Sequence, residues 1–246
     1  MDTNLHLTHH RSSLFLLAIL MNEMSQYLYA EYFFSLLLKD ENIKHQPCVL
    51  ANIHGNIDYM CRQKGDLQNA FHHCEFVLKL YKENSSNDNH QTIATFLVNL
   101  GEIYIIKGEF NRALINYERA LTIDINPTNS KKPNFEYIFN CYNQLGIICE
   151  RTGRYVKVLD CYEKCLQIRL ENMPRNHPDL LIPYNNIAFL YDRLSQSEKA
   201  IYIYMRILKI SISSFSQDHL NVATLYHNIT CNLEDLGRFN EALVYE

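Results

Sequence analysis

Apolar residues along this chain recur with the spacing of amphipathic helices. Leu97, Leu100 and Tyr104 lie three and four positions apart in one segment, and Ala113 and Tyr117 repeat the spacing in the next. Side chains at these intervals share one face of a helix. The pattern therefore predicts consecutive amphipathic helices joined by short turns.

A small residue recurs at the predicted turn between the two helices of each pair. It stands at intervals of 40, 43, 45, 42 and 42 residues, as Ser25, Gly65, Gly108, Gly153, Ser195 and Gly237. Glycine or serine permits the backbone conformation that a tight turn between helices needs. A fixed period of this length indicates a repeat protein, here five helical hairpins and part of a sixth.

Two further columns of small residues accompany each turn. Seven positions before it stand Ala18, Asp58, Gly101, Gly146, Ala188 and Thr230, and five positions after it stand Ala30, Ala70, Ala113, Val158, Ala200 and Ala242. Small residues at fixed places predict close crossings of helices. Because a single hairpin cannot bury its apolar face, neighbouring hairpins are expected to stack.

These residues resemble the tetratricopeptide repeat, most clearly over Asn99–Tyr104, Gly108–Leu114 and Tyr117–Leu121. The period near 42 is longer than the usual value of about 34. It resembles the extended repeats of kinesin light chains, in which Asn176–Asp179 and Tyr184–Ala188 have close counterparts. The resemblance implies an all-α, right-handed superhelical solenoid of antiparallel helix hairpins that binds proteins.

We expect one solenoid over residues 1–246, with departures from the family pattern near its ends. The first repeat has Ser25 in place of glycine, and the second has Asp58, Cys61 and Cys74 at packing positions. The last repeat is incomplete at Glu246. The approximate repeat boundaries are 11–40, 51–82, 94–125, 139–171, 181–212 and 223–246.

Composition and charge narrow the classes of partner. The chain is 47% hydrophobic and has seven glycines and six prolines, which suits long helices joined by short loops. Its 23 basic and 27 acidic residues give a net charge of −4 and are spread along the sequence, so no nucleic-acid partner is expected. The apolar stretch Leu14–Met21 is too short to span a membrane.

The eight cysteines and the absence of a cleavage signal predict a cytoplasmic protein. The cysteines lack paired metal-site spacing and are diluted over the chain, so they are interpreted as free thiols in a reducing compartment. His9, His10 and Arg11 precede the apolar stretch as in a signal peptide. No small-x-small cleavage site follows them, which argues against secretion.

An amide recurs nine positions before the turn residue in five consecutive repeats. The resemblance implies that the first helix of each hairpin lines a concave face where peptides lie. An amide offers both donors and acceptors, so a row of amides can bind the backbone of an extended peptide. The alternative is that some of these amides only bridge neighbouring helices. This amide row consists of Asn56, Asn99, Gln144, Asn186 and Asn228.

Charged residues on the same predicted face suggest a preference for acidic partners. Arg151 and Arg193 would present guanidinium groups, with Glu102 and Tyr59 on the same face about a turn earlier in other repeats. An acidic or carboxylate-bearing segment suits guanidinium groups. The alternative is that these arginines are simply solvated.

The clamp with which related repeats bind chaperone C-termini is not reproduced. The place of its first lysine is occupied by Gly55, Val98, Asn143, Asn185 and His227. Binding to chaperone C-termini is therefore not predicted.

Histidine and cysteine clusters invite a metal hypothesis. Asn89–His90, Asn176–His177 and Asp218–His219 each precede a repeat, but Asn or Asp before a helix is an ordinary N-cap, and capping is the better interpretation. The clusters His72–Cys74 and Cys161–Cys165 lack a third and fourth ligand at partner spacing and favour core packing. We also find no catalytic motif. No metal, cofactor or enzymatic activity is expected.

The leading hypothesis is a non-catalytic adaptor that binds short linear segments of other proteins in its concave groove. One alternative is a regulatory or targeting arm of a larger enzyme whose catalytic domain lies outside this sequence. Another is a structural solenoid that self-associates through the incomplete last repeat, which stops at Glu246.

Overall fold

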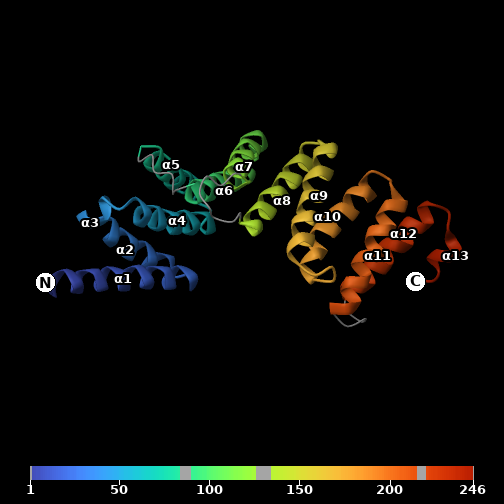
Figure 1. Cartoon of the computed structure of the whole chain (residues 1–246), viewed down its shortest axis with the longest axis horizontal. Helices are drawn as coiled ribbons and strands as arrows, with labels where there is room; N and C mark the ends of the chain where they lie inside the picture. The colour runs from blue at the N-terminus through green and yellow to red at the C-terminus, as the bar shows by residue number, and fades with distance from the viewer. Residues whose placement is uncertain (1, 84–89, 126–133, 215–219, 246) are drawn as a thin grey trace. The chain divides into compact units, whose positions relative to one another are not determined.

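The computed structural model describes residues 2–83, 90–125, 134–214 and 220–245, and these ranges contain helices and no strand (Figure 1). The elements in chain order are α1 (Asp2–Glu23), α2 (Tyr27–Leu38), α3 (Glu41–Lys44), α4 (Pro47–Gln63), α5 (Leu67–Glu83), α6 (His90–Ile106), α7 (Phe110–Ile125), α8 (Phe135–Arg151), α9 (Tyr155–Asn172), η2 (Pro178–Leu180), α10 (Leu181–Arg193), α11 (Ser197–Ser214), α12 (Leu220–Asp235) and α13 (Phe239–Ala242). None of the helices in these ranges is both long enough and apolar enough to cross a membrane.

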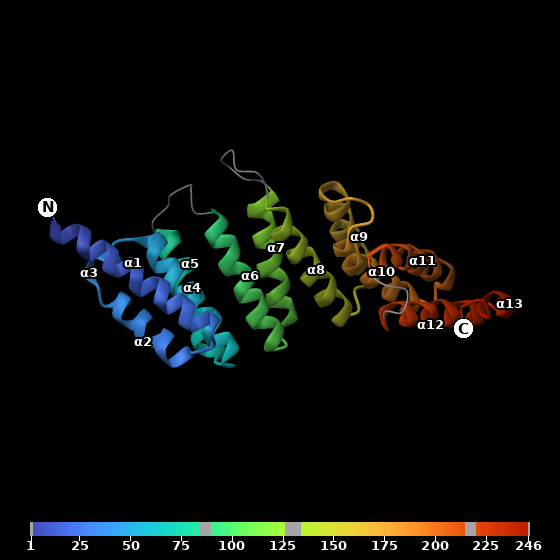
Figure 2. The ribbon, with the colours of Figure 1, turned by 90° about the horizontal axis from the view of Figure 1, so that it is seen from below.

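The chain forms two compact units, residues 1–133 and residues 134–246, called unit 1 and unit 2 below. In unit 1 the hairpins are α1 with α2, α4 with α5, and α6 with α7. In unit 2 they are α8 with α9, α10 with α11, and α12 with α13. Figure 2 shows the paired helices α6 and α7 lying side by side within unit 1.

The six predicted turn residues all adopt the left-handed backbone conformation. The four glycines have φ between 71° and 77°, while Ser25 and Ser195 have φ of 58° and 53°. The residue after each turn residue closes the preceding helix, as where the Gln196 amide donates to the Tyr191 carbonyl at 2.9 Å. This arrangement is the usual glycine-type helix end. The predicted turns are therefore confirmed.

Close helix crossings occur where the sequence predicts them. Gly101 faces the ring of Tyr117, and Gly146 faces the ring of Tyr162. A Cβ atom added to Gly146 would lie 2.3 Å from Cε1 of Tyr162, so only glycine fits at this approach. The residues five positions after the turns are buried as well, since all six are at most 2% exposed. Each hairpin is thus held by an aromatic or alanine contact at a fixed place.

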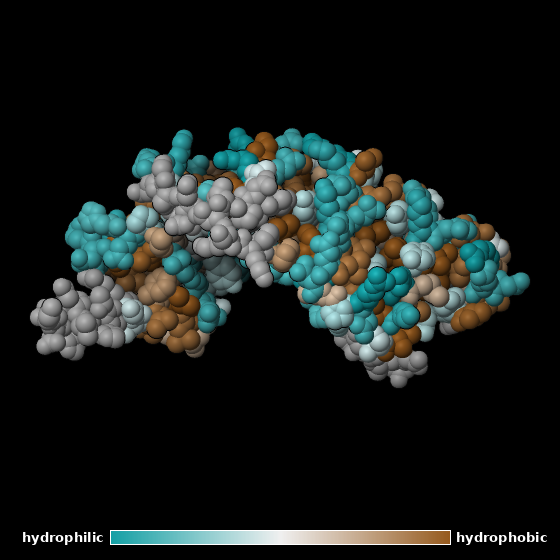
Figure 3. Space-filling model, in the orientation of Figure 1, coloured by the Kyte–Doolittle hydropathy of each residue, from teal (hydrophilic) through white to brown (hydrophobic). Residues whose placement is uncertain are grey.

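The first hairpin leaves apolar side chains exposed on its surface. Figure 3 shows apolar surface over α1 and α2. Leu16, Leu28, Tyr29 and Tyr32 are the main exposed apolar or aromatic residues there. In the second hairpin, the residues that follow its turn at the same distances as Leu28 and Tyr29 are the polar Gln68 and Asn69. The outer face of α2 therefore departs from the polar pattern of the next repeat.

Candidate functional site

The five residues of the amide row lie on the first helices of five hairpins. Asn56 is on α4 and Asn99 on α6 in unit 1, whereas unit 2 holds Gln144 on α8, Asn186 on α10 and Asn228 on α12. All five are half-buried. The repeat brings each amide to the same register on its helix.

In unit 1, Asn99 and Asn56 use some of their side-chain hydrogen-bonding groups within the protein. Asn99 Nδ2 donates to Asp58 Oδ2 at 2.7 Å and joins α6 to α4. Asn56 Nδ2 donates to the carbonyl oxygen of Asn52, one turn earlier, at 2.9 Å. An asparagine has two N–H donors and a carbonyl oxygen, so these bonds use only one donor of each side chain.

Asp58 is a fully buried carboxylate at a position that the other repeats fill with small residues. Arg62 Nη2 lies 3.2 Å from Asp58 Oδ2, and the Cys74 thiol also hydrogen-bonds to Asp58. Burial raises the pKa of Asp58, and the Arg62 charge opposes this shift. Cys74 holds the repeat position at which Tyr117 and Tyr162 face Gly101 and Gly146. Because cysteine is smaller than tyrosine, it leaves room for the Asp58 carboxylate.

Glu102, predicted as a groove residue, is paired with a residue of the preceding hairpin. Its carboxylate accepts a hydrogen bond from Arg62 Nη1. Burial raises the pKa of Glu102, and the neighbouring Arg62 charge counteracts the shift. Arg62 thus joins Asp58 and Glu102 in one polar cluster between α4 and α6. Glu102 therefore takes part in a contact between hairpins.

In unit 2 the three amides differ in their hydrogen-bond partners. Asn186 Nδ2 donates to Asn143 Oδ1 at 2.8 Å and joins α10 to α8. The Asn228 side chain hydrogen-bonds to the hydroxyl of Tyr204. Within the described part of the chain, the side chain of Gln144 has no hydrogen-bond partner. Gln144 is therefore the member of the row whose amide is most available to a ligand.

The two predicted arginines of unit 2 line one open cleft of about 510 Å³ with Glu150 and Tyr155. Arg193 Nη1 lies 2.5 Å from Glu150 Oε1, and its Nη2 donates to the Tyr155 hydroxyl at 3.3 Å. Arg151 is exposed at the same cleft. The cleft thus combines two guanidinium groups with one carboxylate.

Sequence reasoning missed the partner carboxylates of this face. Glu150 and Asp192 stand three positions before their turn residues, as Arg62 does in unit 1. Asp192 accepts hydrogen bonds from Tyr204 and, at 2.8 Å, from Asn232 Nδ2. A recurring charge at this position is a signal that could have identified the inter-hairpin contacts.

The cysteines of both predicted clusters are buried, whereas His72 is exposed and His73 is half-buried. Cys61, Cys74, Cys149 and Cys165 are all buried. Burial raises the pKa of Cys161 and Cys165 to about 12, which keeps both thiols protonated at neutral pH. Among the described residues, no group of three or more His, Cys, Asp or Glu side chains could hold a metal ion.

One of the predicted helix caps is formed, but by the histidine and not by the asparagine before it. The cap of η2 is His177, whose Nδ1 accepts from the Asp179 amide at 3.2 Å, and not Asn176. Pro178 occupies the first helical position, as expected. Asn89 and the pair Asp218–His219 lie outside the described residues.

Comparison with known proteins identifies the repeat. Residues 49–126, 137–213 and 179–246 match the family model described as Tetratricopeptide repeat. No curated protein matches the chain. The solved structure of BtubC (BKLC) from P. vanneervenii has a TM-score of 0.68 at 16% identity, covering 96% of this chain and 87% of that one.

Two other solved structures share the fold. The nearly identical TPR-like repeats of a kinesin light chain from Podosopora anserina give a TM-score of 0.64 at 17% identity, covering 82% of this chain and 93% of that one. A Signal Transduction ATPase with Numerous Domains from Pyrococcus horikoshii, which has a tetratricopeptide repeat sensor, gives 0.72 at 15% identity, covering 94% of this chain and 35% of that one. At such identities the likeness establishes a common helical-repeat fold.

Proposed function

Because the chain belongs to the tetratricopeptide-repeat family, we propose that it is an adaptor that binds short segments of partner proteins along the first helices of its hairpins. Repeats of this family are typically non-catalytic interaction modules, and stacked hairpins present extended surfaces for such binding. We accordingly assign the chain a binding role and no chemical step.

The observation that carries the proposal is the half-buried amide row with hydrogen-bonding capacity left over. Asn99 and Asn186 each use one N–H group on a neighbouring hairpin, at 2.7 and 2.8 Å. Their second N–H group and carbonyl oxygen, together with the whole amide of Gln144, are the groups proposed to bind a partner's backbone. Binding through backbone groups would tolerate many partner sequences.

The cleft of Arg151 and Arg193 supports a preference for acidic segments in unit 2. Guanidinium groups bind carboxylates through charge-assisted hydrogen bonds. Glu150 already balances part of this charge through its 2.5 Å contact with Arg193. We therefore expect Glu150→Gln to strengthen the binding of acidic peptides, because the substitution removes the competing carboxylate while keeping the side chain's size.

Gln144→Leu tests the proposal with the least disturbance of the fold. Peptides selected from a random displayed library on the whole chain would be measured by fluorescence anisotropy. Loss of one or two hydrogen bonds predicts about 3- to 30-fold weaker binding. Gln68→Leu, an equally exchanged amide on the exposed surface of α5, serves as the control and should bind normally.

Two results would refute this function. One is a library selection that yields no peptide above background on the folded chain. The other is equal affinity of the Gln144→Leu variant and the unaltered chain for every selected peptide. Circular dichroism melts of both variants establish that any difference in affinity does not come from unfolding.

The proposed location is the cytoplasm. All eight cysteines are free thiols, including the exposed Cys48. Free thiols persist in reducing compartments and are commonly oxidised to disulfides in secreted proteins. Fluorescence microscopy of a tagged chain is the direct test.

A further inference from the structure

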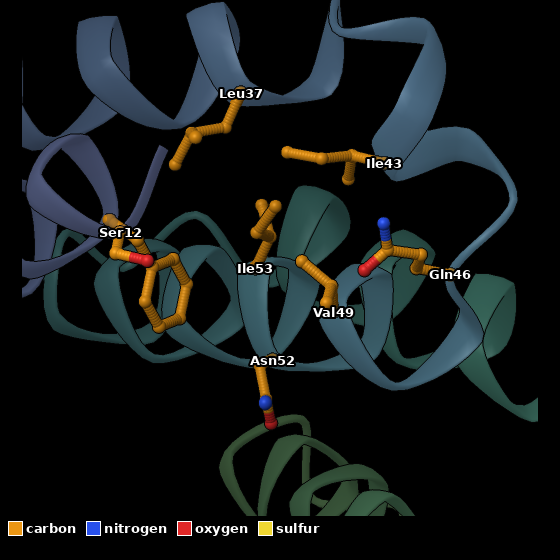
Figure 4. Close-up of a pocket in the computed structure, with 8 residues that line it drawn as sticks. Ser12, Leu37, Ile43, Gln46, Val49, Asn52 and Ile53 are labelled. Atoms are coloured by element: carbon orange, nitrogen blue, oxygen red, sulfur yellow. The ribbon is translucent and has the colours of Figure 1, made fainter. Parts of the chain in front are cut away.

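A pocket opens between the first two hairpins of unit 1, at α1, α2, α3 and α4. Its volume is about 260 Å³. Leu37 from α2, Ile43 from α3 and Ile53 from α4 form its floor, and Figure 4 shows these three side chains converging. They are 3%, 3% and 0% exposed. The floor is thus wholly apolar and belongs to the core of unit 1.

The short helix α3 contributes one side of this pocket. Its N-cap Asp40 accepts a hydrogen bond from the Asn42 amide at 2.9 Å, which fixes the single turn that carries Ile43. The charges on α3 neutralise one another, since Lys44 Nζ lies 2.6 Å from Glu41 Oε1. Neither of these charged residues lines the pocket.

The walls of the pocket are apolar, and its rim is polar but uncharged. Phe15 and Val49 are half-buried walls, and the exposed rim consists of Ser12, Gln46 and Asn52. In Figure 4 the amide of Gln46 lies between Ile43 and Val49, and its Nε2 donates to the Asn42 carbonyl at 3.0 Å. Among the residues whose side chains the structure describes, none that lines the pocket is charged.

The pocket adjoins the amide row. Asn52 lies one helical turn before Asn56 on α4, and the two residues are joined through the 2.9 Å bond from Asn56 Nδ2 to the Asn52 carbonyl. A chain that binds at Asn56 would therefore pass close to the pocket rim. An extended segment places alternate side chains on the side facing the protein.

We propose that this pocket binds one bulky, uncharged apolar side chain of the partner segment, either aromatic or large aliphatic. This inference rests on the proposed function and states what the partner must contain. The volume lies just below the roughly 300–1,000 Å³ of pockets for drug-sized ligands. It suits a single side chain.

The chemistry of the lining selects among occupants of that size. Among the described lining residues, a fatty acid or an acidic side chain would find no cation for its carboxylate, and a lysine would find no carboxylate for its ammonium group. An apolar side chain gains from the floor and walls, while the rim amides can bind the peptide groups on either side of it.

Capped amino acids test the pocket without a known partner. N-acetyl-phenylalaninamide and N-acetyl-leucinamide would be titrated into the whole chain, and the methyl NMR signals of Ile43 and Ile53 would be followed. Saturable shifts in the millimolar range are expected for these two probes. N-acetyl-alaninamide and N-acetyl-glutamic acid amide should bind at least 10-fold more weakly. Absence of saturable shifts, or equal binding of the glutamic acid probe, overturns the inference.

A filling substitution provides the second measurement. Val49→Phe places a ring in the pocket and should weaken binding of N-acetyl-phenylalaninamide at least 10-fold without lowering the Tm. Val156→Phe makes the same exchange at an exposed position on α9, where Val156 is 88% exposed, and should leave probe binding unchanged. If Val49→Phe lowers the Tm, the probe titration on the unaltered chain decides alone.

The two proposals fail in different ways. If N-acetyl-phenylalaninamide binds but no displayed peptide is selected, the pocket stands and the proposed function does not. If selected peptides bind and depend on Gln144, yet carry no common apolar residue and ignore Val49→Phe, the function stands and the assignment of the pocket is wrong.

Discussion

Gly146→Ala is the sharpest test of the crossing between α8 and α9. The added Cβ would lie 2.3 Å from Cε1 of Tyr162 and 2.7 Å from its Cδ1. Tyr162 is 3% exposed, and its hydroxyl is 3.5 Å from Glu150 Oε2. The ring therefore has little free space to move into, and the two helices must separate or the ring must leave its preferred rotamer.

The expected loss of stability follows from two opposing effects. Overpacking a well-packed core typically costs about 1–3 kcal/mol. Alanine is the better residue in a helix interior and returns about 0.5–1 kcal/mol. We expect a net loss of about 1–2 kcal/mol. For a chain of this length it corresponds to a fall in Tm of about 2–8 °C.

Thermal and urea unfolding, followed by circular dichroism, measure this loss. Gly55→Ala is the matched control, because Gly55 is also helical and the nearest atom to an added Cβ is Phe96 Cζ at 3.3 Å. That variant should be neutral or slightly stabilised. In the double variant Gly146→Ala/Tyr162→Leu the clash is absent, so its loss of stability should be smaller than the sum of the two single losses.

The reasoning fails if Gly146→Ala is as stable as the unaltered chain. It also fails if Gly55→Ala costs as much as Gly146→Ala, because the penalty would then not arise from the ring of Tyr162. Additive losses in the double variant would likewise show that position 146 and Tyr162 do not interact.

Two other predictions concern local strain and pH. Ser195→Gly should raise the free energy of unfolding by about 0.5–1 kcal/mol. Ser195 is exposed and has φ of 53°, a backbone conformation that glycine adopts without a Cβ clash. A lower Tm of this variant would contradict the prediction. Burial, with smaller contributions from His73 and His72, lowers the pKa of His54 to about 4, and His54 Nδ1 lies 2.7 Å from His73 Nδ1. The folded state then binds fewer protons than the unfolded state, so this stabilisation is complete above about pH 6.5 and is lost as the pH falls toward 4. His54→Leu should flatten urea-measured stability over that range, and an unchanged slope would refute the assignment.

The turns and crossings could be predicted from sequence because each depends on one local requirement. A left-handed residue must end each first helix, and glycine or serine at a regular interval marks that residue. The columns of small residues report close approach in the same way. Both signals are contained within one hairpin and repeat in the next, so a single sequence is sufficient to find them.

The polar contacts between hairpins could not be predicted in the same way. Arg193 pairs with Glu150, and Asn99 bonds to Asp58, each across about one repeat. Such pairs depend on how far neighbouring helices are displaced along each other, which the repeat period does not specify. In the sequence, Asp58 is only an exception in the column of small residues. The structure explains it, because Arg62, Asn99 and Cys74 hydrogen-bond to its carboxylate or pair with it.

Short elements also escaped prediction for a physical reason. The helix α3 has four residues, Glu41–Lys44, and a single turn shows no periodicity. Its position becomes apparent only from the Asp40 cap and from the burial of Ile43. The pocket at α3 was therefore invisible in the sequence, although its amide-bearing neighbour Asn56 was found.

Two residues of the amide row already have a structural role besides the binding role that we propose for the row. Asn99 and Asn186 join neighbouring hairpins, so replacing either residue removes an inter-hairpin hydrogen bond and in the case of Asn99 leaves the buried Asp58 carboxylate with one donor fewer. Leaving a buried polar group unsatisfied costs about 1–3 kcal/mol. Weaker peptide binding by Asn99→Leu would thus have two explanations. Gln144 occupies the same place in its repeat without such a bond in the described chain, so a loss of binding there reports contact with the ligand.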